Sequence, residues 1–253
     1  MAERLKVFPE AQIAEIRRGL DEVRRAPWPA MEGCLALLVT SRSGSTYLAR
    51  ELECAFAIGR LRESLNPPRL KERPAAQIVE SRLDQWFSFK ASAQGVIAAE
   101  LCGFFDAYLP ETSFVLLCRR DVVGQAVSWV KANQTRQWHS TQTPSAAAFY
   151  DRPMIAQYIS VIVGVVGRLR LYARRSGRPW RALIYEDFAR GDFTKAMETC
   201  DALGIPRRHA ASRIRPMPVE RIGDATNEAW AARFQQEMDS ASGKLIDQYL
   251  TEL

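Results

Sequence analysis

The sequence predicts an α/β fold in which a central, mostly parallel sheet is flanked by helices. Three continuous apolar runs of strand length, at 34–40, 113–118 and 182–185, indicate strands that are covered on both faces. Helical patterns lie between these runs, and such alternation is typical of layered α/β proteins. The 253 residues suffice for one large domain. We therefore expect a single domain over 1–253, with 30–253 as its core and 1–29 as an N-terminal helical extension.

The helices are predicted from apolar residues that recur at spacings of three and four. The first such pattern covers residues 10–25 and ends before Pro27. The later patterns lie at 46–57, 92–108, 122–133, 154–175, 193–203 and 228–252. The segments 59–75 and 134–152 lack this periodicity, and we expect them to be loops.

Composition and charge exclude several classes of protein. The hydrophobic share of 47% and the charged share of 25% are those of a globular protein, not of a disordered, collagen-like or disulfide-stapled chain. Thirty-five Lys and Arg against 29 Asp and Glu leave a charge of +6, which fits an anionic partner. No RNP-like aromatic motif, zinc-finger spacing or basic helical stripe accompanies this charge, so we expect no nucleic-acid partner.

The N-terminus, the longest apolar stretch and the cysteines bear on the compartment. The chain begins with charged residues and lacks an apolar signal core, so we expect no secretory signal. The stretch 154–171 is interrupted by polar residues and is shorter than the roughly 20 apolar residues of a membrane span, which favours a buried helix. Five cysteines without a CxxC pair, and only two histidines, favour free thiols in a reducing cytoplasm and no metal site.

A candidate anion-binding loop directly follows the first apolar run and precedes a helix. It reads Thr40-Ser41-Arg42-Ser43-Gly44-Ser45-Thr46. Small residues let backbone N–H groups approach an oxyanion, and the following helix adds its positive N-terminal end. The hydroxyl groups add donors, and Arg42 adds a positive charge. The loop lacks the Lys of a Walker A loop. The alternative is an ordinary serine-rich turn that caps a helix.

This loop and four later segments resemble, in the same order, the motifs of one enzyme family. The segments are Arg42-Ser43-Gly44-Ser45-Thr46, Arg119-Arg120-Asp121-Val122-Val123-Gly124-Gln125-Ala126-Val127-Ser128, Gln134-Thr135-Arg136-Gln137-Trp138, Ile184-Tyr185-Glu186-Asp187-Phe188 and Arg221-Ile222-Gly223-Asp224-Ala225-Thr226-Asn227-Glu228-Ala229-Trp230. They are similar to the phosphosulfate loop, the 3′-phosphate segment and three signatures of bacterial carbohydrate sulfotransferases of the trehalose 2-sulfotransferase or NodH-like type. The likeness spans about 34–240.

The resemblance implies a P-loop-like, three-layer sulfotransferase fold and a metal-free enzyme. Such an enzyme transfers a sulfonate group from 3′-phosphoadenosine 5′-phosphosulfate (PAPS) to a hydroxyl of a carbohydrate or glycolipid acceptor. It is compatible with a cytoplasmic homodimer without a transmembrane segment. The alternative is a nucleotide-binding α/β protein, either kinase-like or a catalytically degenerate family member, that transfers no sulfonate.

The resemblance also assigns the donor site. The residues implied to bind PAPS are Arg42, Ser43, Gly44, Ser45, Thr46, Arg119, Ser128 and Arg221. Arg42 would stabilise charge on the leaving 5′-phosphate, and it cannot act as an acid because its pKa stays above about 12. Arg119 and Ser128 are implied to hold the 3′-phosphate. The neighbouring Arg120 is an alternative to Arg119, and Ser128 is equally compatible with a solvent-facing helix serine.

The acceptor hydroxyl must lose a proton as it attacks sulfur, so a general base is expected nearby. The resembled family places a Glu soon after the phosphate-loop helix, and Gly59-Arg60-Leu61-Arg62-Glu63-Ser64-Leu65 fits that pattern, with Glu63 as the catalytic base. The common family form has Pro at the position of Leu61 and an aromatic pair at Ser64-Leu65, so the resemblance leaves the local loop shape and the acceptor open here. Glu63 would otherwise pair with Arg60 or Arg62, and His139 is the rival base.

Overall fold

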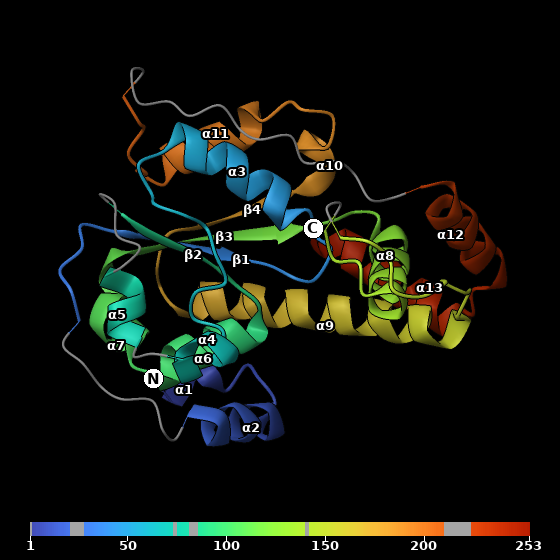
Figure 1. The fold of residues 1–253 in the computed structure, drawn as a ribbon, viewed down its shortest axis with the longest axis horizontal. Coiled ribbons are helices and arrows are strands. Elements are labelled where there is room, and N and C mark those ends of the chain that lie inside the picture. The colour runs from blue at the N-terminus through green and yellow to red at the C-terminus, as the bar shows by residue number, and fades with distance from the viewer. Residues whose placement is uncertain (1, 21–27, 73–74, 81–85, 140–141, 210–223) are drawn as a thin grey trace.

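Four parallel strands form the sheet that runs through the described part of the chain (Figure 1). The computed structural model describes residues 2–20, 28–72, 75–80, 86–139, 142–209 and 224–253. The strands are β1 (Cys34–Leu38), β2 (Phe87–Ala91), β3 (Thr112–Cys118) and β4 (Trp180–Ile184). They lie in the order β2-β1-β3-β4. Because all pairs are parallel, the carboxyl ends of the strands meet at one edge.

The continuous apolar runs become strands because helices cover both faces of the sheet. Every residue of β1 and β3 is buried. Alternate residues point to opposite faces, so Ala36 and Leu38 belong to one hydrophobic cluster and Leu35 and Leu37 to another. The predicted α/β fold with a parallel, helix-flanked sheet is thereby confirmed.

The helices pack in two layers around this sheet. In Figure 1, α3, α10 and α11 lie on one side, and α6 and α9 lie on the other. The helices are α1 (Ala2–Leu5), α2 (Glu10–Leu20), α3 (Ser45–Ala55), α4 (Pro67–Glu72), α5 (Ala75–Glu80), α6 (Ala93–Leu101), α7 (Phe104–Tyr108), α8 (Val122–Thr135), α9 (Arg152–Arg175), α10 (Tyr185–Phe188), α11 (Thr194–Ala202), α12 (Ala225–Glu237) and α13 (Ser240–Glu252). A short 3₁₀ turn, Leu109–Glu111, precedes β3.

Strand β2 lies in a region that the sequence analysis left without a strand. It pairs with β1, with Phe87 opposite Cys34 and Ala91 opposite Leu38. Its apolar run is interrupted by Ser88 and Lys90, so no continuous hydrophobic segment marks it in the sequence. Lys90 lies near the carboxyl end of β2.

Two predicted helices are each divided in the structure. The pattern at 92–108 becomes α6 and α7 because Gly103, with φ of 82°, adopts a left-handed conformation between them. The pattern at 228–252 becomes α12 and α13, and Asp239 caps the second by accepting a hydrogen bond from the backbone of Ser242. Helix α4 also forms within the segment 59–75, which was expected to be a loop.

The N-terminal helices are joined to the core by a buried carboxylate. Glu100 on α6 is fully buried, and Arg4 contacts both its oxygens at 2.6 and 2.9 Å. The Tyr172 hydroxyl on α9 donates a third hydrogen bond at 2.7 Å. Such multiple contacts are needed because a buried charge without partners costs several kcal/mol. Leu5 and Phe8 complete the attachment by packing into the core.

Helix α9 confirms the helix predicted for residues 154–175, but only one face of it is buried. Its Ile155, Ile159 and Leu169 side chains are fully buried in the core beneath the sheet. Within the described residues, α9 is the one helix whose length and apolar composition would also allow it to cross a membrane.

Candidate functional site

The predicted anion loop lies at the carboxyl end of β1 and leads into α3. Gly44 caps α3 with φ of 85°, and a Cβ atom there would lie 2.3 Å from the Tyr185 ring. Only glycine therefore fits this position, both for its backbone conformation and for the space available. Arg42 also adopts a left-handed conformation, with φ of 61°. Glycine adopts this conformation freely, whereas at Arg42 it indicates strain of the kind found at functional sites.

A buried glutamine holds the loop in this shape. Gln125 on α8 donates through Nε2 to the Thr40 hydroxyl at 2.8 Å and to the Ser41 carbonyl oxygen at 2.7 Å. Its own side chain is almost inaccessible to solvent. The sequence analysis gave Gln125 no role, although it lies in the Arg119–Ser128 motif. The loop conformation is thus fixed by the protein itself and requires no ligand.

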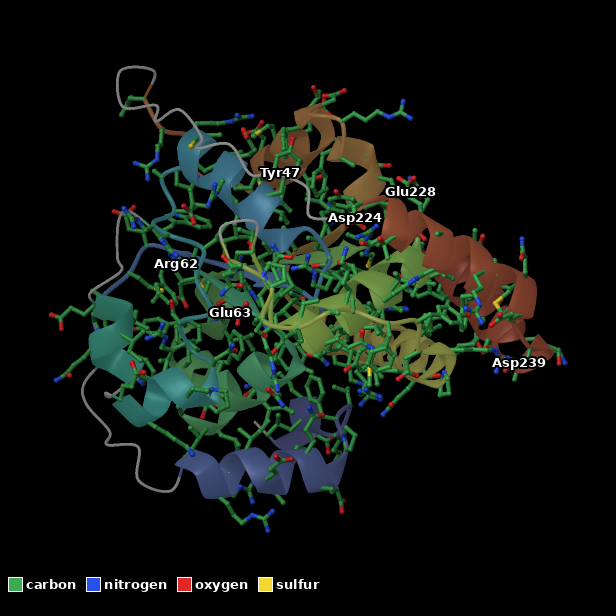
Figure 2. All side chains as sticks on the ribbon, turned by 45° about the vertical axis from the view of Figure 1, so that its right-hand side comes forward. Tyr47, Arg62, Glu63, Asp224, Glu228 and Asp239 are labelled. Atoms are coloured by element: carbon green, nitrogen blue, oxygen red, sulfur yellow. The ribbon has the colours of Figure 1, made fainter. Side chains whose placement is uncertain are left out.

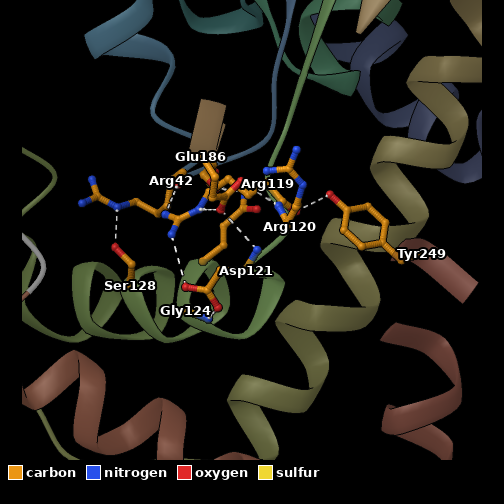
Figure 3. A network of polar contacts seen from close by, with 10 residues as sticks. Arg42, Arg119, Arg120, Asp121, Gly124, Ser128, Glu186 and Tyr249 are labelled. Carbon is orange, nitrogen blue, oxygen red and sulfur yellow. Dashed lines mark hydrogen bonds and ion pairs between the residues drawn. The ribbon is translucent and has the colours of Figure 1, made fainter. Parts of the chain in front are cut away.

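The Arg42 side chain crosses from the loop to α8. Its Nε donates to the Ser128 hydroxyl at 3.0 Å (Figure 3), and its Nη1 donates to the Trp138 carbonyl oxygen at 2.7 Å. Ser128 therefore faces the loop and not the solvent. Burial, and next the positive charge of Arg119, lower the pKa of Arg42. Both effects disfavour its charge in the free protein, so an anion bound here would relieve them.

The structure distinguishes the two neighbouring arginines. The Arg119 side chain is 14% exposed, and its Nη1 donates to the Arg42 carbonyl oxygen at 3.3 Å. The Arg120 side chain is 52% exposed and turns to Asp187, with a 2.8 Å contact (Figure 3 shows the two diverging). Arg119, and not Arg120, therefore belongs to the loop.

Motif residues after β4 orient Arg119. Its guanidinium lies 4.6 Å from the centre of the Tyr185 ring, on the residue that also packs on Gly44. Glu186 accepts hydrogen bonds from the backbone N–H groups of Arg120 and Asp121 at 2.9 and 3.2 Å. Tyr185 and Glu186 belong to one of the segments that resemble the family motifs, but no role was predicted for either residue. Their task in the fold is to fix the start of α8.

Buried donors without partners mark where a ligand would bind. Within the described residues, the Ser43 hydroxyl and Arg119 Nε are buried and have no hydrogen-bond partner, although Arg119 Nε lies 3.7 Å from a Glu186 carboxylate oxygen. An unmade hydrogen bond in the interior costs about 1–3 kcal/mol. No side chain caps the N-terminus of α3 at Ser45 and Thr46 either. Phosphate and sulfate oxygens accept hydrogen bonds from donors of these kinds, so the residues present fit the donor that the resemblance implies.

The candidate base reaches this loop through one lysine. Glu63 is 55% exposed on its side chain, and its carboxylate lies 2.7 Å from Asn66 Nδ2 and 3.9 Å from Lys90 Nζ. Lys90 in turn donates to the Thr46 hydroxyl at 3.4 Å. Burial lowers the pKa of Lys90, and the nearby Glu63 carboxylate partly offsets that effect. The structure thus brings Glu63 and the phosphate loop together across Lys90.

His139 lies at the same site. It follows Trp138, whose carbonyl oxygen accepts a hydrogen bond from Arg42. Burial lowers the pKa of His139, and so do the positive charges of Lys90 and Arg42, so the imidazole is neutral at pH 7. Both candidate bases therefore lie near the loop, and the choice between them remains a prediction.

The C-terminal motif approaches the site on its α8 side. Arg221 lies outside the described residues. Just after it, Asp224 caps α12 and pairs with Lys131 of α8 at 2.6 Å. Asn227 and Lys131 line a small gap together with Arg42 and Ser128. The described part of the chain contains no cluster of three or more His, Cys, Asp or Glu residues that would hold a metal ion.

The chain is similar to one protein family in sequence and to two sulfotransferases in structure. The sequence model of the Stf0 sulphotransferase family matches residues 99–237, which is more than half of the chain and includes Arg119 and Ser128. A sulfotransferase from Alicyclobacillus acidocaldarius aligns with 88% of this chain and 96% of its own, at 13% identity and a TM-score of 0.48. The sulfotransferase domain of the Synechococcus PCC 7002 olefin synthase aligns with 89% of this chain and 98% of its own, at 14% identity and a TM-score of 0.48. No curated protein matches this chain by sequence.

Proposed function

Because the chain belongs to the Stf0 sulphotransferase family, we propose that it transfers a sulfonate group from PAPS to a hydroxyl of a carbohydrate or glycolipid acceptor. The observation that carries this proposal is the meeting of Arg42, Arg119 and Ser128 beside the unpaired donor of Ser43. The family match supports sulfonate transfer, and the arrangement of donors supports PAPS as its source.

The donor site has two parts, one for each anionic end of PAPS. The loop 42–46 and the free N–H groups of α3 would bind the 5′-phosphosulfate, with Arg42 as the cation. Arg119 and Ser128 would bind the 3′-phosphate at the start and second turn of α8. In the free protein, the Ser128 hydroxyl accepts a hydrogen bond from Arg42. When the donor binds, this hydroxyl would exchange Arg42 for the 3′-phosphate.

The chemistry that these residues serve is an in-line displacement at sulfur. The acceptor oxygen forms a bond to sulfur, and the bond from sulfur to the 5′-phosphate oxygen breaks. Negative charge grows on that leaving oxygen, where Arg42 and Lys90 would stabilise it. The proton of the acceptor hydroxyl goes to the base, which we assign to Glu63 because Lys90 places it beside Thr46.

We expect Arg119→Ala to weaken donor binding much more than the matched variant Arg120→Ala does. Losing the inward Arg119 removes charge-assisted hydrogen bonds worth about 1.5–3 kcal/mol, which weakens the affinity for 3′-phosphoadenosine 5′-phosphate (PAP) about 10- to 100-fold. Losing the outward Arg120 should change it less than about twofold, because an exposed ion pair contributes about 0–1 kcal/mol. Titration calorimetry with PAP measures both, and equal losses would contradict the assignment of Arg119.

The catalytic proposal is tested by transfer of radiolabelled sulfonate. The purified protein is incubated with labelled PAPS and carbohydrate or glycolipid extracts, with and without a metal chelator. We expect a labelled glycan product that forms equally well in the presence of chelator. PAP binding without any labelled product would instead favour the nucleotide-binding, non-transferring alternative. Release of inorganic phosphate that requires a divalent metal would favour a kinase-like or hydrolase activity.

A further inference from the structure

A hollow of about 440 Å³ opens beside Glu63, and Lys90 is not among the residues that line it. This volume lies within the range of small-molecule sites. The side chains that line it are Arg60, Arg62, Glu63, Ser64, Asn66, Pro68 and Arg69. Figure 2 labels two of them, Arg62 and Glu63, which lie near each other. Three positive charges against one negative charge make the hollow an electropositive place beside the candidate base.

Backbone contacts fix the arginine-bearing segment in position. Leu61 is buried, and its N–H donates to the Glu53 carboxylate at 2.7 Å. The Arg62 carbonyl oxygen accepts from the Lys90 N–H at 2.8 Å, so the segment runs along β2. Because Leu61 points inward, its neighbours Arg60 and Arg62 are left exposed on the hollow.

The polar groups of the hollow are not fully used within the protein. Ser64 is only 2% exposed, yet its hydroxyl has no hydrogen-bond partner among the described residues. Arg69 pairs with Glu72 at 3.2 Å. In the same described residues, the guanidinium groups of Arg60 and Arg62 form no ion pair. In the part of the chain that the structure describes, the hollow is thus lined by a buried hydroxyl and by two guanidinium groups without an ion pair, beside Asn66, whose Oδ1 also lacks a hydrogen-bond partner.

We infer that this hollow binds a negatively charged group of the acceptor, so that the acceptor is an acidic carbohydrate or glycolipid. The inference rests on the proposed sulfonate transfer and specifies its acceptor. Guanidinium groups bind carboxylate and phosphate oxygens in pairs, and a serine hydroxyl adds one further donor. The charged group would lie among Arg60, Arg62 and Ser64. The hydroxyl to be sulfated would then lie at Glu63, toward Lys90 and the loop.

The sequence departs from the family pattern at one residue of this hollow. Ser64 stands where the resembled family commonly has the first residue of an aromatic pair. A small hydroxyl residue at that position opens space and supplies a donor, whereas an aromatic side chain would offer a flat apolar surface. The departure from the family pattern therefore falls on the residue whose buried hydroxyl lacks a partner.

Binding of three trisaccharides to the PAP-saturated protein tests the inference. The probes are maltotriose, trigalacturonate and a phosphorylated maltotriose, and their Kd values are compared at fixed low salt. We expect at least one acidic probe to bind about 10-fold or more tighter than maltotriose, from one or two charge-assisted contacts. The carboxylated and phosphorylated probes then show which anion the hollow prefers.

Matched variants locate the effect. The double substitution Arg60→Ala, Arg62→Ala should abolish the preference for the acidic probe. Arg181→Ala removes an exposed arginine at the opposite edge of the sheet, on β4, and should leave the preference unchanged. Equal Kd values for all three probes, or a preference that survives the double substitution, would overturn the inference while PAP binding leaves the proposed function standing. Absence of PAP binding would overturn the proposed function and the inference with it.

Discussion

Replacing Arg42 with alanine is expected to reduce kcat for sulfonate transfer by about 10²- to 10³-fold, the usual cost of removing one preorganised group that stabilises developing charge. Gln125 and Tyr185 hold the backbone of the Arg42 loop in place, so only the Arg42 side chain has to turn from Ser128 toward the donor. Arg42→Lys should recover part of the rate. It retains the charge but loses the two-pronged geometry that reaches both Ser128 and Trp138. Initial rates with saturating labelled PAPS provide the measurement.

The distant variant Arg181→Ala is the control for this experiment, and a thermal unfolding curve of each protein shows whether the fold is retained. Wild-type turnover by a folded Arg42→Ala protein would contradict the assigned role. An alanine variant whose loss lay wholly in KM would show that Arg42 binds the donor without stabilising the transition state.

Replacing Glu63 with glutamine is expected to lower kcat by about 10²- to 10⁴-fold, the typical contribution of a general base. The affinity for PAP should stay within about twofold, because Glu63 reaches the phosphate loop only indirectly, across Lys90. The side chain is half exposed, so the substitution should hardly affect folding. Turnover and PAP titration on the same preparation separate chemistry from donor binding.

His139→Gln is the matched variant for the base assignment. A neutral imidazole must be protonated before it stops acting as a base, and the pKa of His139 is already lowered from 6.5. If His139 were the base, wild-type kcat would fall as the pH drops through that lowered value, and His139→Gln would remove this dependence. Full activity of Glu63→Gln together with a large loss in His139→Gln would transfer the role to His139.

The strands were predictable where burial requires an uninterrupted run of apolar residues in the sequence. Strands β1 and β3 are buried throughout and β4 at its carboxyl end, so their apolar runs stand out. Strand β2 was missed because Ser88 and Lys90 interrupt its run. The ammonium group of Lys90, at the carboxyl end of this buried strand, links Glu63 to Thr46. The helix break at Gly103 was equally hidden, because a left-handed residue leaves the apolar periodicity intact.

The site was predictable where its residues are close together in sequence. The loop 40–46 carries its own chemistry in consecutive residues, and the Arg119–Ser128 motif fixes its members by helical spacing. Contacts between distant segments were not predictable, as when Gln125 binds the loop from 84 or 85 residues away. The choice between Arg119 and Arg120 depends on side-chain direction, which the sequence of two identical neighbours does not contain.

The central claim is that this loop and the start of α8 together bind a nucleotide with two separate phosphate groups. Calorimetric titration with PAP, and with adenosine 5′-phosphate as the matched ligand that lacks the 3′-phosphate, tests it most directly. We predict a micromolar or tighter Kd for PAP in the absence of metal, about 10- to 100-fold tighter than for adenosine 5′-phosphate, because we assign Arg119 and Ser128 to the 3′-phosphate. Failure to bind PAP at micromolar concentrations, or equal affinity for the two nucleotides, would contradict it.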